Sequence, residues 1–279
     1  MRYSLLFVVP LVLFVVPSAR SQQQTPPNAP ATTCAADVGT PSNANAQLTP
    51  RQAAELHADL LMAEKQYADA VRAYRKILET DPKSAQVLDL TGVAYQQMLN
   101  LREAENYYKK ATKVDKTYAS ALNNIGTVEY TRKHYKKAIN YYKKALKICT
   151  DKASFYTNLG YAYFETKQYP EAIASFQQAL LIDPSVFQSH GEGGAIVQQR
   201  ATTDPGLFYF YVAKSFALAG NAAETAHFLK MSRDDGYKDF MSAAKDPAFV
   251  KVIKDPRVQQ VLTVTPVYAT DQRKKTAHD

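Results

Sequence analysis

The sequence predicts an all-α solenoid of stacked helix hairpins. Its residue pattern repeats along the chain, each repeat divides into two amphipathic stretches, and helix-ending dipeptides occur between repeats. Residue types recur every 34 residues from residue 51 to residue 186, with no insertion or deletion. Each unit holds two stretches of helical periodicity, for example 154–166 and 170–182, joined by a three-residue turn. Asp-Pro follows the second stretch in units one and four, and this dipeptide ends one helix and starts the next.

Five columns of the repeat agree in register, which chance does not produce. They are Ala58, Gly92, Gly126 and Gly160; Tyr67, Leu101, Tyr135 and Tyr169; Ala70, Ala104, Ala138 and Ala172; Tyr74, Tyr108, Tyr142 and Phe176; and Ile77, Ala111, Ala145 and Ala179. Gly or Ala lets two helix backbones approach, and the aromatic ring fills the gap beside them. We therefore predict four helix hairpins within residues 50–186, at 51–84, 85–118, 119–152 and 153–186.

The unit resembles the tetratricopeptide repeat (TPR) in its length and in its small, aromatic and proline positions. In unit four the eight signature positions hold Tyr156, Leu159, Gly160, Tyr163, Ala172, Phe176, Ala179 and Pro184. Unit one is weaker, with Ala54 and His57 where large apolar residues are usual, as is typical of a terminal repeat with a solvated side. The resemblance implies a right-handed TPR helix-hairpin solenoid that acts as a protein-interaction scaffold.

Unit three places Glu129 where the family normally carries tyrosine. We expect this side chain to turn outward and pair with Lys133, one helical turn later. The alternative is a buried carboxylate with a raised pKa that awaits a cation from a ligand.

The first 49 residues predict export. Arg2, the apolar run 5–16 and the small residues after Pro17 are typical of a signal peptide at 1–21, cleaved near Ser21. A membrane anchor and a lipid anchor at Cys34 are the alternatives. Residues 22–49 are rich in Pro, Gln and Ala and predict a disordered tether. Cys34 lies in that tether; we expect a solvated spare cysteine, with a disulfide to Cys149 or to another chain as the alternative.

The C-terminal part predicts an end to the stack. Residues 187–205 form a Gly-containing insert, and residues 206–265 a degenerate fifth helix hairpin with short C-terminal capping helices after Asp246-Pro247 and Asp255-Pro256. Residues 266–279 are a polar tail.

Composition and motifs exclude several kinds of chemistry. With 46% apolar and 22% charged residues, the chain is neither collagen-like nor wholly disordered. Two cysteines cannot form a Cys-rich zinc site, so we expect no metal and no cofactor. No Gly-x-Ser-x-Gly, phosphate-binding or His-Glu-x-x-His motif is present. Between Ser189 and Gly194 a nucleophile, a base and an acid are chain neighbours, which cannot face one another as a catalytic set. We therefore expect no enzyme.

The resemblance implies that the first helix of each unit lines a concave groove. The residues implied there are Gln96 and Gln97 in unit two; Asn123, Asn124, Thr127 and Tyr130 in unit three; and Thr157, Asn158, Tyr161 and Phe164 in unit four. Amides can satisfy both the donors and the acceptors of a peptide backbone, and aromatic rings bury its side chains. We expect a protein or peptide partner of unknown identity. The alternative that the chain's own tail fills the groove stays open.

A basic stripe follows the second helices. It consists of Arg72, Arg75, Arg102, Lys109, Lys113, Lys136, Lys143 and Lys147. A solvated face is the ordinary interpretation of such a stripe. The alternative is that it binds an anionic envelope surface, either membrane or wall polymer. Nucleic acid fits the net charge of +8 but not the export signal.

Overall fold

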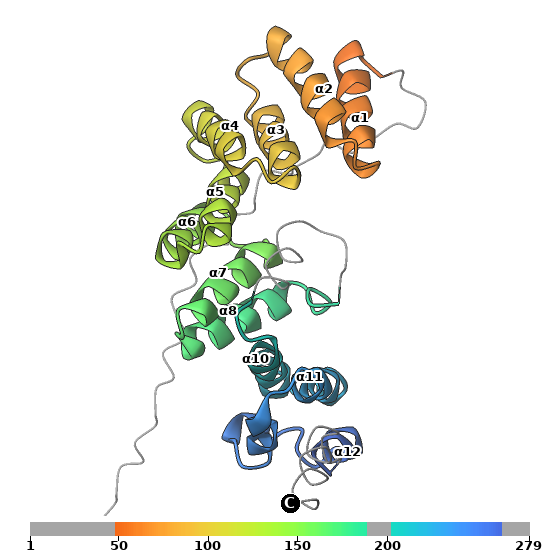
Figure 1. The fold of residues 1–279 in the computed structure, drawn as a ribbon, viewed down its shortest axis with the longest axis vertical. Helices are drawn as coiled ribbons and strands as arrows, with labels where there is room; N and C mark the ends of the chain where they lie inside the picture. The colour runs from red at the N-terminus through yellow and green to blue at the C-terminus, as the bar shows by residue number, and fades with distance from the viewer. Residues whose placement is uncertain (1–47, 189–201, 264–279) are drawn as a thin grey trace, which may run out of the picture. The chain divides into compact units, whose positions relative to one another are not determined.

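The computed structural model describes residues 48–188 and 202–263, and every regular element within these ranges is a helix. Successive helices pair as hairpins, and each hairpin packs on the next (Figure 1). The hairpins are α1 (Pro50–Ala63) with α2 (Tyr67–Thr80), α3 (Ala85–Gln97) with α4 (Leu101–Val114), α5 (Ala119–Thr131) with α6 (Tyr135–Ile148), α7 (Ala153–Glu165) with α8 (Tyr169–Ile182), and α10 (Pro205–Leu218) with α11 (Ala222–Asp234). The predicted all-α solenoid of helix hairpins is confirmed.

Several sequence predictions concern residues outside the described ranges. They include the signal peptide, the tether as far as residue 47, residues 189–201 of the insert, residues 264–265 of the capping region and the whole polar tail at 266–279. Cys34 lies outside as well. Cys149 is described, and it is buried and disulfide-bonded, which goes against the expectation of a spare cysteine.

Short polar side chains cap the starts of some helices, whereas α2, α5, α6, α7 and α8 begin without a side-chain cap hydrogen bond. Thr49 Oγ1 accepts a hydrogen bond from the backbone N–H of Gln52 (3.2 Å), and the Gln52 side chain accepts one from the backbone N–H of Thr49 (2.9 Å). This reciprocal pair is a capping box that starts α1. α3, α4, α10 and α11 are each capped by a single hydrogen bond that the N-cap side chain accepts. The N-cap residues are Ser84, Asn100, Asp204 and Asn221.

The turn inside each of the first four hairpins contains one residue in the left-handed region. These residues are Lys65, Leu99, Lys133 and Lys167, with φ between 58° and 63°. Gly220 takes that place in the fifth hairpin, with φ of 80°. Because a left-handed residue reverses the chain within a single turn, the second helix folds back at once on the first.

Small residues and aromatic rings interlock inside each hairpin. A Cβ added to Gly92, Gly126 or Gly160 would lie 2.5, 2.6 or 2.3 Å from a ring carbon of Tyr108, Tyr142 or Phe176. All three rings are fully buried. The glycine and aromatic columns of the sequence are therefore two sides of one contact between the paired helices.

The fifth hairpin joins the stack through aromatic rings. Phe208 of α10 stacks on Tyr161 of α7 at 4.7 Å between ring centroids, and Tyr211 stacks on Tyr169 of α8 at 4.4 Å. Beyond α11 lie two 3₁₀ segments, η1 (Lys238–Ala244) and η2 (Pro247–Phe249), and then α12 (Pro256–Thr263). The predicted capping helices correspond to η2 and α12, and their Phe249 and Val258 side chains are fully buried. No proline or cap pattern in the sequence had signalled η1.

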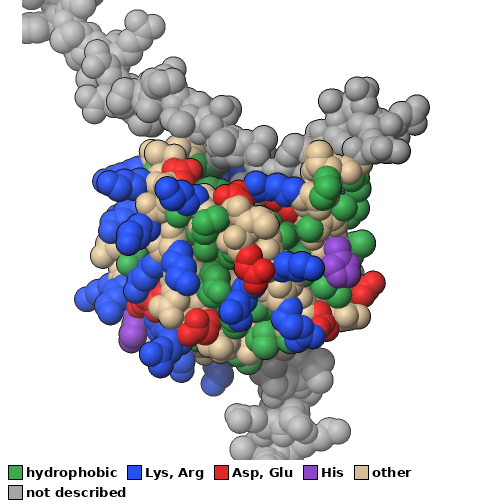
Figure 2. Space-filling model, turned by 90° about the horizontal axis from the view of Figure 1, so that it is seen from above, with side chains coloured by type: hydrophobic (Ala, Val, Ile, Leu, Met, Phe, Trp, Pro, Cys, Tyr) green, Lys and Arg blue, Asp and Glu red, His purple; other side chains and the backbone are tan. Residues whose placement is uncertain are grey.

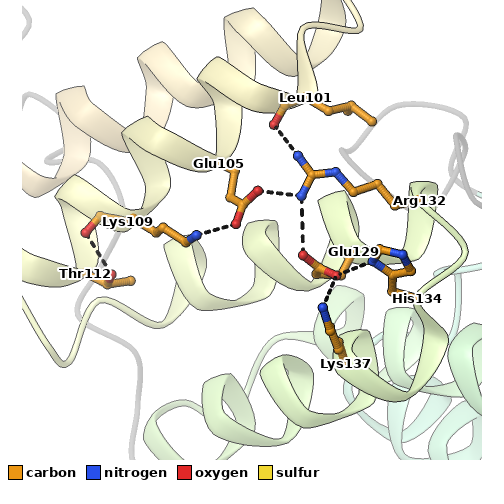
Figure 3. A network of polar contacts seen from close by, with 8 residues as sticks. All are labelled: Leu101, Glu105, Lys109, Thr112, Glu129, Arg132, His134 and Lys137. Carbon is orange, nitrogen blue, oxygen red and sulfur yellow. Dashed lines mark hydrogen bonds and ion pairs between the residues drawn. The ribbon is translucent and has the colours of Figure 1, made fainter.

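Glu129 is buried, and the expectation that it turns outward to Lys133 is wrong. Its carboxylate lies 2.8 Å from His134 Nδ1, 3.3 Å from Arg132 and 4.0 Å from Lys137 (Figure 3). Lys133 occupies the left-handed turn, with φ of 63°, so it does not follow Glu129 along the same helix face.

Arg132 extends this cluster into the preceding hairpin. Its guanidinium pairs with Glu105 of α4 and donates to the Leu101 carbonyl at 3.3 Å, and Lys109 also pairs with Glu105 (Figure 3). The network therefore joins α4 to the α5–α6 hairpin.

This network predicts an acid-sensitive contribution to stability. Burial alone would raise the pKa of Glu105, but hydrogen bonds from Lys109 and Arg132 lower that pKa below its ordinary value. A lowered folded-state pKa stabilises the fold above the unfolded pKa of about 4.3, and the stabilisation is lost as pH falls through the folded value. We expect Glu105→Gln to lower the free energy of unfolding by about 1–3 kcal/mol at neutral pH.

The loss should shrink as the pH falls below about 5, first because Glu105 of the unfolded chain binds protons and finally because the folded carboxylate is protonated below its lowered pKa. Urea denaturation at a series of pH values measures it. Glu79→Gln, at an exposed position of α2, serves as the matched control. A Glu105→Gln loss that stays constant across the pH series would contradict the prediction.

Candidate functional site

The residues implied for the concave groove lie on the first helices α3, α5 and α7, but most are covered. Gln97 is exposed, and Gln96 and Asn124 are half-buried. The buried ones are Asn123, Thr127, Tyr130, Thr157, Asn158, Tyr161 and Phe164. They form two sets, a row of amides and a group of aromatic rings.

The amides of α5 and α7 form a directed row of hydrogen bonds that ends at Asp89 of α3. Asn158 Nδ2 donates to Asn123 Oδ1 (3.0 Å), and Asn123 Nδ2 donates to Asn124 Oδ1 (3.3 Å). Asn124 Nδ2 in turn donates to both carboxylate oxygens of Asp89, at 3.1 and 3.3 Å. Every donor points toward the negative charge of Asp89, so the row, here called the amide row, links three successive hairpins with one polarity.

At the α7 end of the amide row, opposite Asp89, lies an acceptor that lacks a donor. Asn158 is 1% exposed, and its Oδ1 is the one buried side-chain nitrogen or oxygen without a hydrogen-bond partner in the described parts of the chain. A buried acceptor left without a partner costs about 1–3 kcal/mol. A hydrogen-bond donor from another molecule would therefore gain the most free energy on the amide row by pairing with Asn158 Oδ1.

The aromatic residues Tyr161 and Phe164 belong to the core, which corrects the sequence expectation that they face a ligand. Phe208 of α10 lies 4.7 Å from the Tyr161 ring and 5.4 Å from the Phe164 ring. This contact could not be predicted from the sequence. A 19-residue insert separates unit four from the fifth hairpin, and the sequence alone did not indicate which face of unit four that hairpin covers.

Tyr130 is also largely internal. Its ring lies 5.1 Å from that of Tyr135, and its hydroxyl reaches Glu165 Oε1 at 3.5 Å. Glu165 also accepts hydrogen bonds from Thr203, just before α10, at 3.2 and 3.1 Å. Glu165 thus connects unit four to the start of the fifth hairpin. The sequence analysis did not predict these hydrogen bonds.

All eight cations of the basic stripe are exposed. Arg72 pairs with Asp69 and Lys109 pairs with Glu105. The other six have no carboxylate partner in residues 48–188 and 202–263: Arg75, Arg102, Lys113, Lys136, Lys143 and Lys147. α6 carries five lysines and no acid, so its outer side is the most strongly cationic helix surface of the first four hairpins.

Two other kinds of site are absent from the described residues. No group of three or more His, Cys, Asp or Glu side chains is placed to hold a metal ion within them. In the same ranges no helix has both the length and the apolar character needed to cross a membrane. The segment from Ser189 to Gly194 lies outside the described residues.

Comparison with known proteins identifies the repeat. Residues 52–84, 85–118 and 153–186 each match a model described as "Tetratricopeptide repeat", and residues 126–167 match one described as "TPR repeat". No curated protein matches the sequence.

Several solved structures are similar. PilF of Pseudomonas aeruginosa is 17% identical with a TM-score of 0.51, over 82% of this chain and 93% of that one. MamA is 21% identical with a TM-score of 0.45, over 65% and 95%. YrrB, described as a TPR protein with an unusual peptide-binding site, is 18% identical with a TM-score of 0.44, over 69% and 91%.

Three of the family models match units one, two and four as delimited from the sequence columns, and the fourth model spans parts of units three and four. The helices of the structure pair as hairpins over the same residues. Repeats of this kind build protein-interaction scaffolds by stacking hairpins into extended binding surfaces. The repeat region of the chain, matched by these models at residues 52–118 and 126–186, consists of tetratricopeptide repeats.

Proposed function

We propose that this chain is a non-catalytic adaptor of the bacterial cell envelope that binds a peptide or protein segment along α3, α5 and α7. The observation that carries the proposal is the amide row with its unpaired acceptor, Asn158 Oδ1. An extended peptide presents backbone N–H donors that can complete such a row. The resemblance to TPR proteins supports a protein partner in general.

The ligand favoured by this chemistry is a neutral stretch of backbone. Apart from the aromatic rings that belong to the core, the predicted groove positions of units two to four hold amides and hydroxyls, with no Lys or Arg to clamp a terminal carboxylate. Asp89, Ser120 and Thr127 are each already engaged in an interaction, so a peptide has to exchange with existing contacts on this face. We therefore expect a ligand that competes for these positions, with Asn158 as its strongest polar contact.

Binding to the amide row is tested with peptides displayed on phage and selected on the full-length protein. Asn158→Ala removes the free acceptor, and we expect the affinity of selected peptides to fall by about 1–3 kcal/mol, measured by calorimetry. Asn140→Ala makes the same chemical change at an exposed position of α6 and should leave affinity unchanged. Equal affinity of all selected peptides for the wild type and Asn158→Ala would reject this site.

Export is a separate step of the proposal. The support is the charged start, the apolar run 5–16 and the small residues before Gln22. When the whole chain is expressed in a bacterium, we expect a mature protein that begins near Gln22 and is not retained by membranes. Mass spectrometry of the envelope and culture fractions gives its N-terminus. An intact Met1 in a salt-resistant membrane fraction would reject soluble export.

A second candidate function is binding to an anionic envelope surface through the basic stripe. It is favoured by the six stripe cations that have no carboxylate partner among the described residues and by the five lysines of α6. A cation near an anionic membrane contributes about 1 kcal/mol, and the attraction falls as salt screens it.

The test changes Lys113, Lys136, Lys143 and Lys147 together to Gln. At low salt we expect co-sedimentation with anionic vesicles or wall polymer to weaken by about tenfold or more. The matched control changes four exposed lysines elsewhere, Lys230, Lys238, Lys245 and Lys254, to Gln. If both variants are retained as well as the wild type, the stripe is an ordinary solvated face.

A further inference from the structure

The first hairpin carries a cavity that lies apart from the amide row and is lined in part by Arg72 of the basic stripe. It has a volume of about 810 Å³ and lies between α1 and α2. Ala54, Leu61, Ala73 and Ile77 provide apolar walls, and His57 and Lys76 lie among the polar lining residues. Figure 2 looks onto the molecule from the side on which α1 and α2 lie in Figure 1, and apolar side chains show there between Lys and Arg side chains.

The repeat explains why this cavity exists. Ala73 occupies the column that holds Tyr107 in unit two and Tyr141 in unit three. Leu61 occupies the column that holds Tyr95 in unit two, and Tyr95 stacks on Tyr107 at 5.5 Å between ring centroids. Unit one thus has two smaller aliphatic side chains where unit two has a stacked pair of rings.

A lysine accompanies this position in all three units. Lys110 Nζ lies 4.5 Å from the centroid of the Tyr107 ring, and Lys144 Nζ lies 5.2 Å from that of Tyr141. Lys76 is the corresponding lysine of unit one, where the ring is missing. No ion pair or ring contact involves Lys76 in the described parts of the chain. Unit one has therefore kept the cation of a cation–π pair and lacks its aromatic partner.

We propose that the first hairpin binds a partner protein by taking one of its aromatic side chains, tyrosine or phenylalanine, into this cavity beside Lys76. The inserted ring occupies the position that Tyr107 holds in unit two. An aromatic anchor in an apolar pocket buries a large area at low entropic cost, and such anchors carry much of the affinity of protein interfaces. The cavity lies on the first hairpin, whereas the amide row lies on α3, α5 and α7. The two sites can therefore be tested independently.

The cavity itself is tested with p-cresol, the side chain of tyrosine, titrated into the full-length protein and followed by NMR. Its saturated analogue 4-methylcyclohexanol has a similar shape and hydroxyl group but no π system. We expect p-cresol to shift signals of Ala73 and Lys76 and to bind about two- to fivefold more tightly than the analogue, as a cation–π contact implies. Lys76→Gln should remove that preference, and Lys110→Gln, whose lysine already has its ring, should keep it.

Ala73→Tyr places the ring in the cavity from within the chain, as units two and three do. We expect it to fold with unchanged helicity by circular dichroism and to lose p-cresol binding. A phage selection on the wild type should yield one class of peptides that needs an open cavity. These peptides should fail to bind Ala73→Tyr but should still bind Asn158→Ala. Each of them should contain an aromatic residue. Equal binding of the two small molecules, p-cresol binding that survives Ala73→Tyr, or the absence of an aromatic, cavity-dependent peptide class would overturn the proposal.

Discussion

The close contact between a small residue on the first helix and an aromatic ring on the second is the constraint on which the hairpins depend. At Gly126 the Tyr142 ring occupies space that a Cβ would need, and the same holds for Gly92 and Gly160. Because the ring packs directly against the glycine backbone, it fixes the distance and the rotation of the two helices relative to each other. Because the geometry recurs with the 34-residue period, equivalent side chains of successive units come to equivalent places.

That recurrence is what allows a row of polar side chains to form across hairpins. Asn124 reaches Asp89 over 35 positions of sequence, and Asn158 reaches Asn123 over the same separation. Buried amides are costly unless each finds a partner, so the row is possible only where consecutive first helices lie at a regular spacing. Its polarity follows from the charge of Asp89 at one end and leaves the unpaired acceptor at the other.

Where the units differ, the differences are local and leave the hairpin framework intact. Glu129 replaces the usual tyrosine of unit three, and the space is used by an ion network that joins α4 to the α5–α6 hairpin. Ala73 replaces the tyrosine of units two and three, and the space remains as a cavity beside Lys76. In unit three the lost bulk is replaced by charged side chains, whereas the lost bulk at the first hairpin stays open because none of the described hairpins covers that face.

The repeat columns by themselves determined the helix hairpins, their turns and their pairing, because the period of 34 and the small–aromatic contact are local properties that each unit carries in its own sequence. The sequence also located the polar first-helix positions and the cationic stripe. It misplaced Glu129, since the left-handed turn at Lys133 brings His134 back to its carboxylate and Arg132 links it to Glu105 of unit two. It also misplaced Tyr161 and Phe164, since Phe208 packs on both rings from beyond a 19-residue insert. Only the tertiary structure decided which polar atoms are paired, because a hydrogen bond such as that from Asn158 to Asn123 depends on the distance between helices of different hairpins, which no local pattern specifies.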